Sequence, residues 1–186
     1  MNLKHIIKPV IYLLLNLSLL PSFSCDSEDK PLESQDLINV EKDALLFMLE
    51  EEKLARDTYE FLYDLWGLQQ FANIGRSEQS HMDAVENLLL AFDISYQILP
   101  EGEFANSDLQ KLYDQLVQSG TRDEVSALIV GATIEDLDIV DLQNQIESVD
   151  NALIIDVFEK LKCGSENHLR AFVEKLCVRR RRSGAL

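Results

Sequence analysis

The chain has 186 residues, of which 33 are acidic and 17 basic, and its formal net charge is −16. This length supports one domain with a sizeable hydrophobic core. So acidic a protein is unsuited to bind nucleic acid or anionic lipid through its general surface, and its three cysteines are too few for a disulfide framework.

The first 24 residues are interpreted as a leader that precedes the folded domain. Lys4 and Lys8 come before an apolar run over residues 10–20, which is too short to span a membrane. The small residues directly before Cys25 resemble the lipobox of bacterial lipoproteins, although Ser22 stands where leucine is usual. This resemblance implies cleavage before Cys25, acylation of its sulfur and attachment to a membrane of the bacterial cell envelope. The alternative is an ordinary secretory signal with a chance cysteine, and it also places the mature protein outside the cytoplasm.

Residues 25–37 are polar and are expected to tether a helical domain that follows over residues 38–177. The first helix is predicted over residues 38–66, with Gly67 as its C-terminal cap. Steps of three and four residues define one stripe along this helix: Leu45, Met48, Glu52, Ala55, Tyr59, Leu62 and Trp66. Glu50 and Glu51 fall off the stripe and are expected to be solvated.

The second helix is predicted over residues 69–93, and the short link Gly67-Leu68 makes it the antiparallel neighbour of the first. Its stripe has the same spacing: Phe71, Ile74, Glu78, His81, Val85, Leu88 and Phe92. A carboxylate in an apolar core must be neutralised, paired or bound to a cation, because burying its charge alone is costly. Glu-x-x-His facing the interior of a helix bundle is the pattern of carboxylate-bridged dimetal sites.

Residues 94–120 depart from the long-helix pattern, since they include Pro100 and Gly102. We expect a crossover here with one short helix that ends at Gly120. A third long helix should start near a capping sequence at residues 121–124. Its stripe is Val125, Leu128, Ala132, Glu135, Ile139, Leu142 and Ile146, and Asp138 lies at the stripe's edge, one turn after Glu135.

The fourth helix is predicted over residues 152–177, with Gly164 as a weak point. Its stripe is Ile154, Phe158, Leu161, Ser165, His168, Phe172 and Leu176. Cys163 and Cys177 would lie about 20 Å apart on this helix, which is too far for a disulfide. Residues 178–186 contain the run Arg179 to Arg182 and are interpreted as a solvated tail in preference to a binding patch.

Each of the four stripes is interrupted near its middle by residues able to bind metal. These residues are Glu52, Glu78, His81, Glu135, Asp138 and His168. Mid-helix positions of an antiparallel bundle meet at one height, and four carboxylates would balance two divalent cations. Oxygen and imidazole ligands without thiolate suit iron, manganese or zinc. The alternative is a buried polar network without metal.

Three of these stretches resemble the ligand motifs of rubrerythrin-type ferritin-like proteins: Glu52-x-x-Ala55-Arg56-x-x-Tyr59, Glu78-x-x-His81 and Glu135-x-x-Asp138. Residues 164–172 resemble an uncharacterised ferritin-like family whose members carry all four stretches, and the likeness covers residues 41–173. It implies an all-α fold, a ferritin-like antiparallel four-helix bundle with two divalent metal ions. Iron is the favoured metal, with manganese or zinc as alternatives. It also implies oxygen or peroxide as a small oxidant, and such bundles often form homodimers.

One position departs from the rubrerythrin pattern. Ser165 stands where the fourth helix of those proteins has a glutamate, and Glu166 is one residue out of register. The predicted site is therefore asymmetric, with an open position for water, peroxide or substrate. Tyr59 could donate a hydrogen bond to the site, although simple packing is the favoured interpretation of this side chain.

The leading hypothesis is an envelope-anchored dimetal-carboxylate protein with oxidase, peroxidase or ferroxidase-type activity. A non-catalytic protein that stores, buffers or senses a divalent cation would use the same ligands and is the main alternative. A third class is an interaction module that kept the bundle and lost turnover. Reversible redox change at bound metal would separate the first class from the other two.

Overall fold

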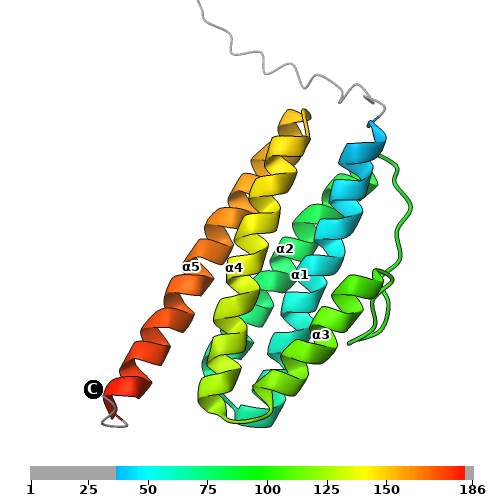
Figure 1. Cartoon of the computed structure of the whole chain (residues 1–186). Coiled ribbons are helices and arrows are strands. Elements are labelled where there is room, and N and C mark those ends of the chain that lie inside the picture. The colour runs from blue at the N-terminus through cyan, green and yellow to red at the C-terminus, as the bar shows by residue number, and fades with distance from the viewer. Residues whose placement is uncertain (1–36, 183–186) are drawn as a thin grey trace, which may run out of the picture. The chain divides into compact units, whose positions relative to one another are not determined.

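The computed structural model describes residues 37–182, and this part of the chain contains five α-helices and no strand (Figure 1). The helices are α1 Asn39–Trp66, α2 Gln69–Ala91, α3 Ser107–Gly120, α4 Glu124–Ser148 and α5 Ala152–Arg182. The predicted all-α helical bundle with one short helix in its crossover is therefore confirmed. The expected leader over residues 1–24 and the lipidation site Cys25 lie outside the described residues.

Two helical hairpins form the bundle. α1 packs along α2, and α4 packs along α5; α1 also contacts α4, and α2 contacts α5 (Figure 1). The link between α1 and α2 is tight because Gly67 adopts the left-handed conformation, with φ of 62°, and its N–H donates to the carbonyl oxygen of Tyr63. The short helix α3 lies against α1 and α4.

The crossover between α2 and α3 is held against α1 by a buried lysine. Lys53 Nζ lies 2.5 Å from Asp57 Oδ2, and it also donates to the carbonyl oxygens of Pro100, at 2.9 Å, and Glu103, at 3.2 Å. Asp57 Oδ2 in turn accepts from the backbone N–H of Gly102, at 2.9 Å. Lys53 and Asp57 are both fully enclosed, so their charges compensate each other inside the protein.

The expectation that Glu50 and Glu51 are solvated is wrong. Glu50 accepts the backbone N–H groups of Ala105, at 2.7 Å, and Asn106, at 2.8 Å, and so holds the end of the crossover. Glu51 is only 5% exposed. The physical reason is that α1 is covered by α2, by α4 and by α3, so its buried surface is much wider than one stripe.

The hydrophobic core consists of two apolar clusters. One includes Leu45, Met48, Met82, Val85, Leu142, Ile154 and Phe158. The other includes Leu54, Tyr59, Leu62, Phe71, Leu128, Ile134 and Phe172. Along every long helix the residues predicted to bind metal fall between the members of the two clusters. A polar layer therefore divides the core at mid-height.

Two helix ends differ from expectation. The N-cap of α4 is Asp123, whose side chain accepts the N–H of Ser126 at 2.7 Å, while Thr121 follows the end of α3. α5 continues to Arg182 instead of ending near residue 177, and Arg179 forms an ion pair with Glu124 at the start of α4. The whole arginine run is thus helical, and its first residue is paired. Both described cysteines lie on α5 as free thiols, as expected.

Candidate metal centre

Five of the six predicted ligands meet in the polar layer. They form two groups, Glu52 with Glu78 and His81, and Glu78 with Glu135 and His168. Within each group one ligand atom from every residue lies within 4.8 Å of the others. Glu78 belongs to both groups and is almost fully buried. One carboxylate shared between two sets of ligands is the arrangement of a bridged dimetal site.

The first group lies between α1 and α2. His81 Nδ1 is 3.1 Å from Glu52 Oε2 and 2.9 Å from Glu78 Oε2. On the far side of the ring, His81 faces Gly164 of α5, where an added β-carbon would sit 2.6 Å from His81 Nε2. The absence of a side chain at Gly164 therefore gives the imidazole the room it occupies.

The second group joins α2 to α4 and α5. His168 Nδ1 is 2.8 Å from Glu78 Oε1 and 3.4 Å from Glu135 Oε2. The Tyr59 hydroxyl lies 2.5 Å from Glu135 Oε1, to which it donates a hydrogen bond. The rings of His81 and His168 stack with their centroids 5.5 Å apart. Tyr59 thus fixes the position of one carboxylate, which goes beyond the packing role favoured from sequence.

The orientation of His168 is set from outside the group. Its Nε2 atom lies 3.0 Å from Ser77 Oγ, on the helix that also carries Glu78. When Nε2–H donates to this hydroxyl, the lone pair of the neutral ring is on Nδ1, which faces Glu78 and Glu135. Such an outer hydrogen bond is the usual way in which proteins orient a metal-binding histidine.

Several atoms of the layer are buried without a hydrogen-bond partner among the described residues. They are Glu52 Oε1, Glu78 Oε1, Asp138 Oδ1 and His168 Nδ1. His168 Nδ1 and Glu78 Oε1 lie 2.8 Å apart but are not aligned for a hydrogen bond. Both atoms therefore remain available as ligands. Buried polar atoms are normally satisfied. These atoms fit a cation held between them.

The pKa values of three groups reflect their mutual attraction. Burial opposes the charge of Glu78, but the adjacent imidazoles of His168 and His81 outweigh it and lower its pKa to about 2. Burial likewise opposes the imidazolium of His81, yet Glu52 and Glu78 raise its pKa to about 11. Glu135 and Glu78 raise the pKa of His168 to about 9 against the effect of burial. Without a cation, protons on the imidazoles balance Glu78.

The remaining carboxyl groups hold protons for a different reason. Burial raises the pKa of Glu52 to about 8 and that of Glu135 to about 7. Burial also raises the pKa of Asp138 well above its usual range, and the charges of Glu52 and Glu135 add to this effect. A divalent cation would replace these protons, because metal binding requires deprotonated carboxylates and neutral imidazoles.

Comparison with known proteins identifies the family of this chain. The model of an uncharacterized protein domain, DUF2202, matches residues 41–184. The chain belongs to this family. The matched range contains every residue of both ligand groups.

A protein that is similar to this chain has a solved structure. "Uncharacterized protein MJ0754" of Methanocaldococcus jannaschii is 50% identical over 147 residues, which cover 78% of this chain and 80% of the relative. The crystal structure of hypothetical protein MJ0754 from Methanococcus jannaschii superposes with a TM-score of 0.71 at 52% identity, covering 73% of this chain and 78% of that one. The helical fold is thus shared with this relative.

Asp138 occupies a separate place in this DUF2202 domain. It belongs to neither ligand group, although it is only 4% exposed. Its Oδ2 atom accepts a hydrogen bond from Ser165 Oγ, which is fully buried and also lies 3.1 Å from the carbonyl oxygen of Leu161. Ser165, the residue expected to leave a position open, is therefore hydrogen-bonded to the Asp138 carboxyl group.

Three residues around the site are not identified by the sequence patterns. The stripes predict Glu51 at the surface, Ser77 belongs to no recognisable motif, and Gly164 is predicted only as a weak point of its helix. For Gly164 a signal was present, because a glycine in mid-helix is unfavourable by about 1 kcal/mol relative to alanine and therefore calls for a packing reason.

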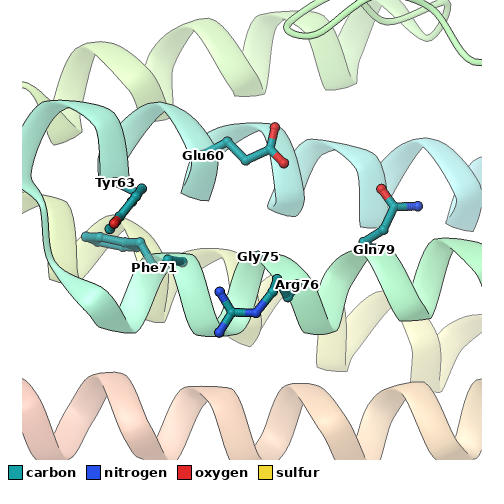
Figure 2. Close-up of a pocket in the computed structure, with 7 residues that line it drawn as sticks. Glu60, Tyr63, Phe71, Gly75, Arg76 and Gln79 are labelled. Carbon is teal, nitrogen blue, oxygen red and sulfur yellow. The ribbon is translucent and has the colours of Figure 1, made fainter.

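A surface cavity of about 280 Å³ lies on the outer side of α1 and α2. Figure 2 shows that Glu60 and Tyr63 of α1 face Phe71, Arg76 and Gln79 of α2 across it. None of the predicted ligands lines it, and one of its lining residues, Phe71, stacks on the Tyr59 ring with 5.9 Å between centroids. The cavity is thus separate from the candidate metal centre. Within residues 37–182, no helix is both long and apolar enough to span a membrane.

Proposed function

We propose that this chain is a ferritin-like dimetal-carboxylate protein with oxidase, peroxidase or ferroxidase-type redox activity. The observation that carries the proposal is the position of Glu78, shared by two groups whose ligand atoms lie within 4.8 Å of one another. The ferritin-like assignment is supported by two antiparallel hairpins joined through a long crossover, with ligands projecting inward at mid-height from all four long helices.

The charges of the site suit two divalent cations. Glu52, Glu78 and Glu135 provide three negative charges, and Asp138 provides a fourth beside them. Together with two neutral imidazoles, these groups would balance two divalent ions inside a layer closed by apolar clusters on both sides. The donor set contains oxygen and nitrogen and no sulfur, which favours iron and leaves manganese or zinc as alternatives.

The residues around the candidate metal centre would hold its ligands in position. Bound iron would supply one-electron chemistry toward a small oxidant such as oxygen or peroxide. Tyr59 holds Glu135 at 2.5 Å, Ser77 orients His168, and Ser165 holds one oxygen of Asp138. Burial of these groups keeps bulk water away, so only a small molecule could reach the ligands.

A second candidate function is non-catalytic binding, storage or sensing of a divalent cation. Ser165 favours it, because this hydroxyl restrains Asp138 Oδ2 and leaves α5 without a carboxylate in the polar layer. A carboxylate that is held at one oxygen changes its binding mode less freely when a metal changes its oxidation state.

The cellular location is proposed from the leader sequence. Cleavage before Cys25 and acylation of its sulfur would anchor the domain at the envelope of a bacterial cell. A Cys25→Ser variant expressed from the full-length gene should then appear in the soluble fraction. Retention of this variant in membranes would exclude the anchor. We also propose that the protein forms a homodimer. Light scattering of the detergent-solubilised protein measures its mass and tests this.

The metal centre is tested by counting metals in matched variants. The full chain is purified without chelator, reconstituted anaerobically with ferrous iron and analysed for bound iron. Wild type should bind two ions per chain, Glu52→Gln and Glu135→Gln one each, and Glu78→Gln none. Glu166→Gln, next to Ser165 on α5, is the control and should retain both ions.

The redox activity is tested on the same samples. Oxygen or peroxide is added, and the consumption of oxidant and the near-ultraviolet absorption are followed before and after reduction. A change that a reductant reverses would support the oxidase or ferroxidase function. Two bound ions without redox change would favour the storage or sensing alternative. Equal metal content in all variants would contradict the site assignment itself.

A further inference from the structure

The candidate metal centre is more open on one side than on the others. The side chains of Glu52, Glu78 and Glu135 are only 1%, 2% and 2% exposed. Those of His81 and His168 are each 13% exposed, so solvent reaches both ligand groups at the imidazole rings. His81 belongs to α2 and His168 to α5, and the open side therefore lies between these two helices.

The opposite side of the centre is closed. The long helices contact one another in the cyclic order α1, α2, α5, α4, so the α1–α4 side faces away from the α2–α5 side. There α3 packs against both α1 and α4, and Glu51 and Asp138 are buried. A molecule coming from that side would have to separate packed helices, whereas one that comes between α2 and α5 meets the histidine rings directly.

Small residues adjoin the two rings on the open side. Gly164 of α5 leaves the room beside His81, and Ser77 of α2 lies 3.0 Å from His168 Nε2. Both small residues are partly exposed. No large side chain from either position therefore covers the outer edges of the stacked imidazoles.

Two alanines extend this surface along the helices. Ala84 follows His81 by three residues on α2, and Ala171 follows His168 by three residues on α5, so each alanine lies on the same face as its histidine. Both alanines are partly exposed. Helical side chains point toward the N-terminus of their helix, so a larger residue at either position would cover the neighbouring histidine.

The lack of charge at these four small residues limits which ligand suits the open side. Ser77, Ala84, Gly164 and Ala171 are all neutral. A metal cation that sheds its water needs oxygen ligands along its way, and an anion would be repelled by a chain with a net charge of −16. A small neutral molecule meets neither obstacle.

We propose that the surface formed by Ser77, His81, Gly164 and His168 between α2 and α5 is the entrance through which a small neutral oxidant, oxygen or hydrogen peroxide, reaches the candidate metal centre. This inference rests on the proposed function, since an entrance needs a centre to serve. It gives the two histidines a second role, because their inner nitrogen atoms face the carboxylates while their outer edges line the entrance.

The entrance is first tested without metal. The metal-free full chain is exposed to hydroxyl radicals, which are neutral and of the size of a water molecule, and the oxidised side chains are located by mass spectrometry. His81 and His168 should be oxidised, whereas Tyr59, which is fully buried beside Glu135, should be protected. Ala84→Leu should protect His81, and Ala171→Leu should protect His168.

The second test follows the oxidant itself. The full chain is loaded anaerobically with ferrous iron and mixed with hydrogen peroxide in a stopped-flow instrument. Ala84→Leu and Ala171→Leu should each retain two iron ions and slow their oxidation by about tenfold, equivalent to about 1.4 kcal/mol in the barrier. Thr133→Leu adds similar bulk at an exposed position of α4 and should react at the wild-type rate.

The outcomes separate the entrance from the proposed function. Wild-type oxidation rates in both alanine variants would overturn the entrance while leaving the centre intact. Equal protection of the histidines and Tyr59 in the wild type would also overturn it. A wild type with oxidised histidines that binds no iron would instead overturn the proposed function, and with it the role of the opening. Circular dichroism checks that each variant is folded, and the two variants lie on different helices, so either one alone provides the test.

Discussion

The Nε2 atom of His168 on α5 lies 3.0 Å from Ser77 Oγ on α2, one residue before Glu78. The same turn of α2 therefore carries the shared carboxylate and the hydroxyl that orients the histidine opposite it. Removing this hydroxyl should release the His168 ring without changing any ligand.

Ser77→Ala should weaken metal binding at the group of Glu78, Glu135 and His168 by about 10–100-fold, the usual effect of losing an outer hydrogen bond to a metal-binding histidine. Competition titration with a chelating dye measures it. Ser80→Ala removes an exposed hydroxyl from the next turn of the same helix and should change nothing. Equal affinities for both variants would mean that Ser77 does not orient the ligand.

Gly164→Ala should stabilise helix α5 and disrupt the candidate metal centre. Alanine is the better helix former by about 1 kcal/mol, but its β-carbon would sit 2.6 Å from His81 Nε2, so the ring must leave its place between Gly164 and the carboxylates of Glu52 and Glu78. We expect a folded protein that binds one metal ion in place of two. In Gly75→Ala the added carbon meets Tyr59 at an ordinary 3.6 Å, and this variant should retain both ions. Full metal content in Gly164→Ala would show that the space beside His81 is not required.

Without metal, the protein should lose stability as the pH rises from about 4.5 to about 9. Glu52 and Glu135 have folded pKa values of about 8 and about 7, above 4.5, and His168 has about 9, above 6.5. The folded state therefore keeps protons that the unfolded chain has already lost, and stability falls as pH increases through these values. Glu78, whose pKa is lowered to about 2, contributes equally throughout this range.

Melting temperatures at about pH 5.5 and about pH 8.5, with a chelator and with bound metal, test this linkage. The chelated protein should melt lower at the higher pH, whereas metal should protect most there, because cations compete with protons for the same ligands. The same dependence on pH with and without metal would place the responsible groups outside the centre.

Lys53→Met should destabilise the fold by about 3 kcal/mol, the scale of removing one partner of a buried ion pair. Asp57 would keep Arg56 as a partner, but the carbonyl groups of Pro100 and Glu103 would lose their donor. Urea unfolding measures the change, and metal content should stay at two ions. Lys160→Met breaks a pair that is 71% exposed on the lysine side and should leave stability almost unchanged. Similar values for both lysines would contradict a structural role for the buried pair.

The fold and most ligands could be predicted because each long helix carries an apolar stripe that polar residues interrupt near its middle. Spacing alone therefore predicted that Glu52, Glu78, His81, Glu135 and His168 face the core, and the helices bring these five together. The position of Asp138 at the edge of its stripe also corresponds to its place beside the ligand groups.

The surroundings of the ligands could not be predicted in the same way. Glu51 is buried because α1 is covered on several sides, and the number of neighbours of a helix is a property of the tertiary fold and not of its own periodicity. Ser77 and Gly164 act across helices, on His168 and His81 respectively. Such contacts depend on the relative rotation of two helices, for which a single sequence holds no direct signal.

The two ligand groups also differ in how much of the chain must assemble before they exist. Glu52, Glu78 and His81 all belong to the α1–α2 hairpin, so one cation could bind while only this contiguous stretch has formed. The other group is completed by Glu135 and His168, and it exists only once the second hairpin has docked. The first ion would therefore accompany local folding, whereas the second would mark the completion of the tertiary structure, with Glu78 as the residue common to both events.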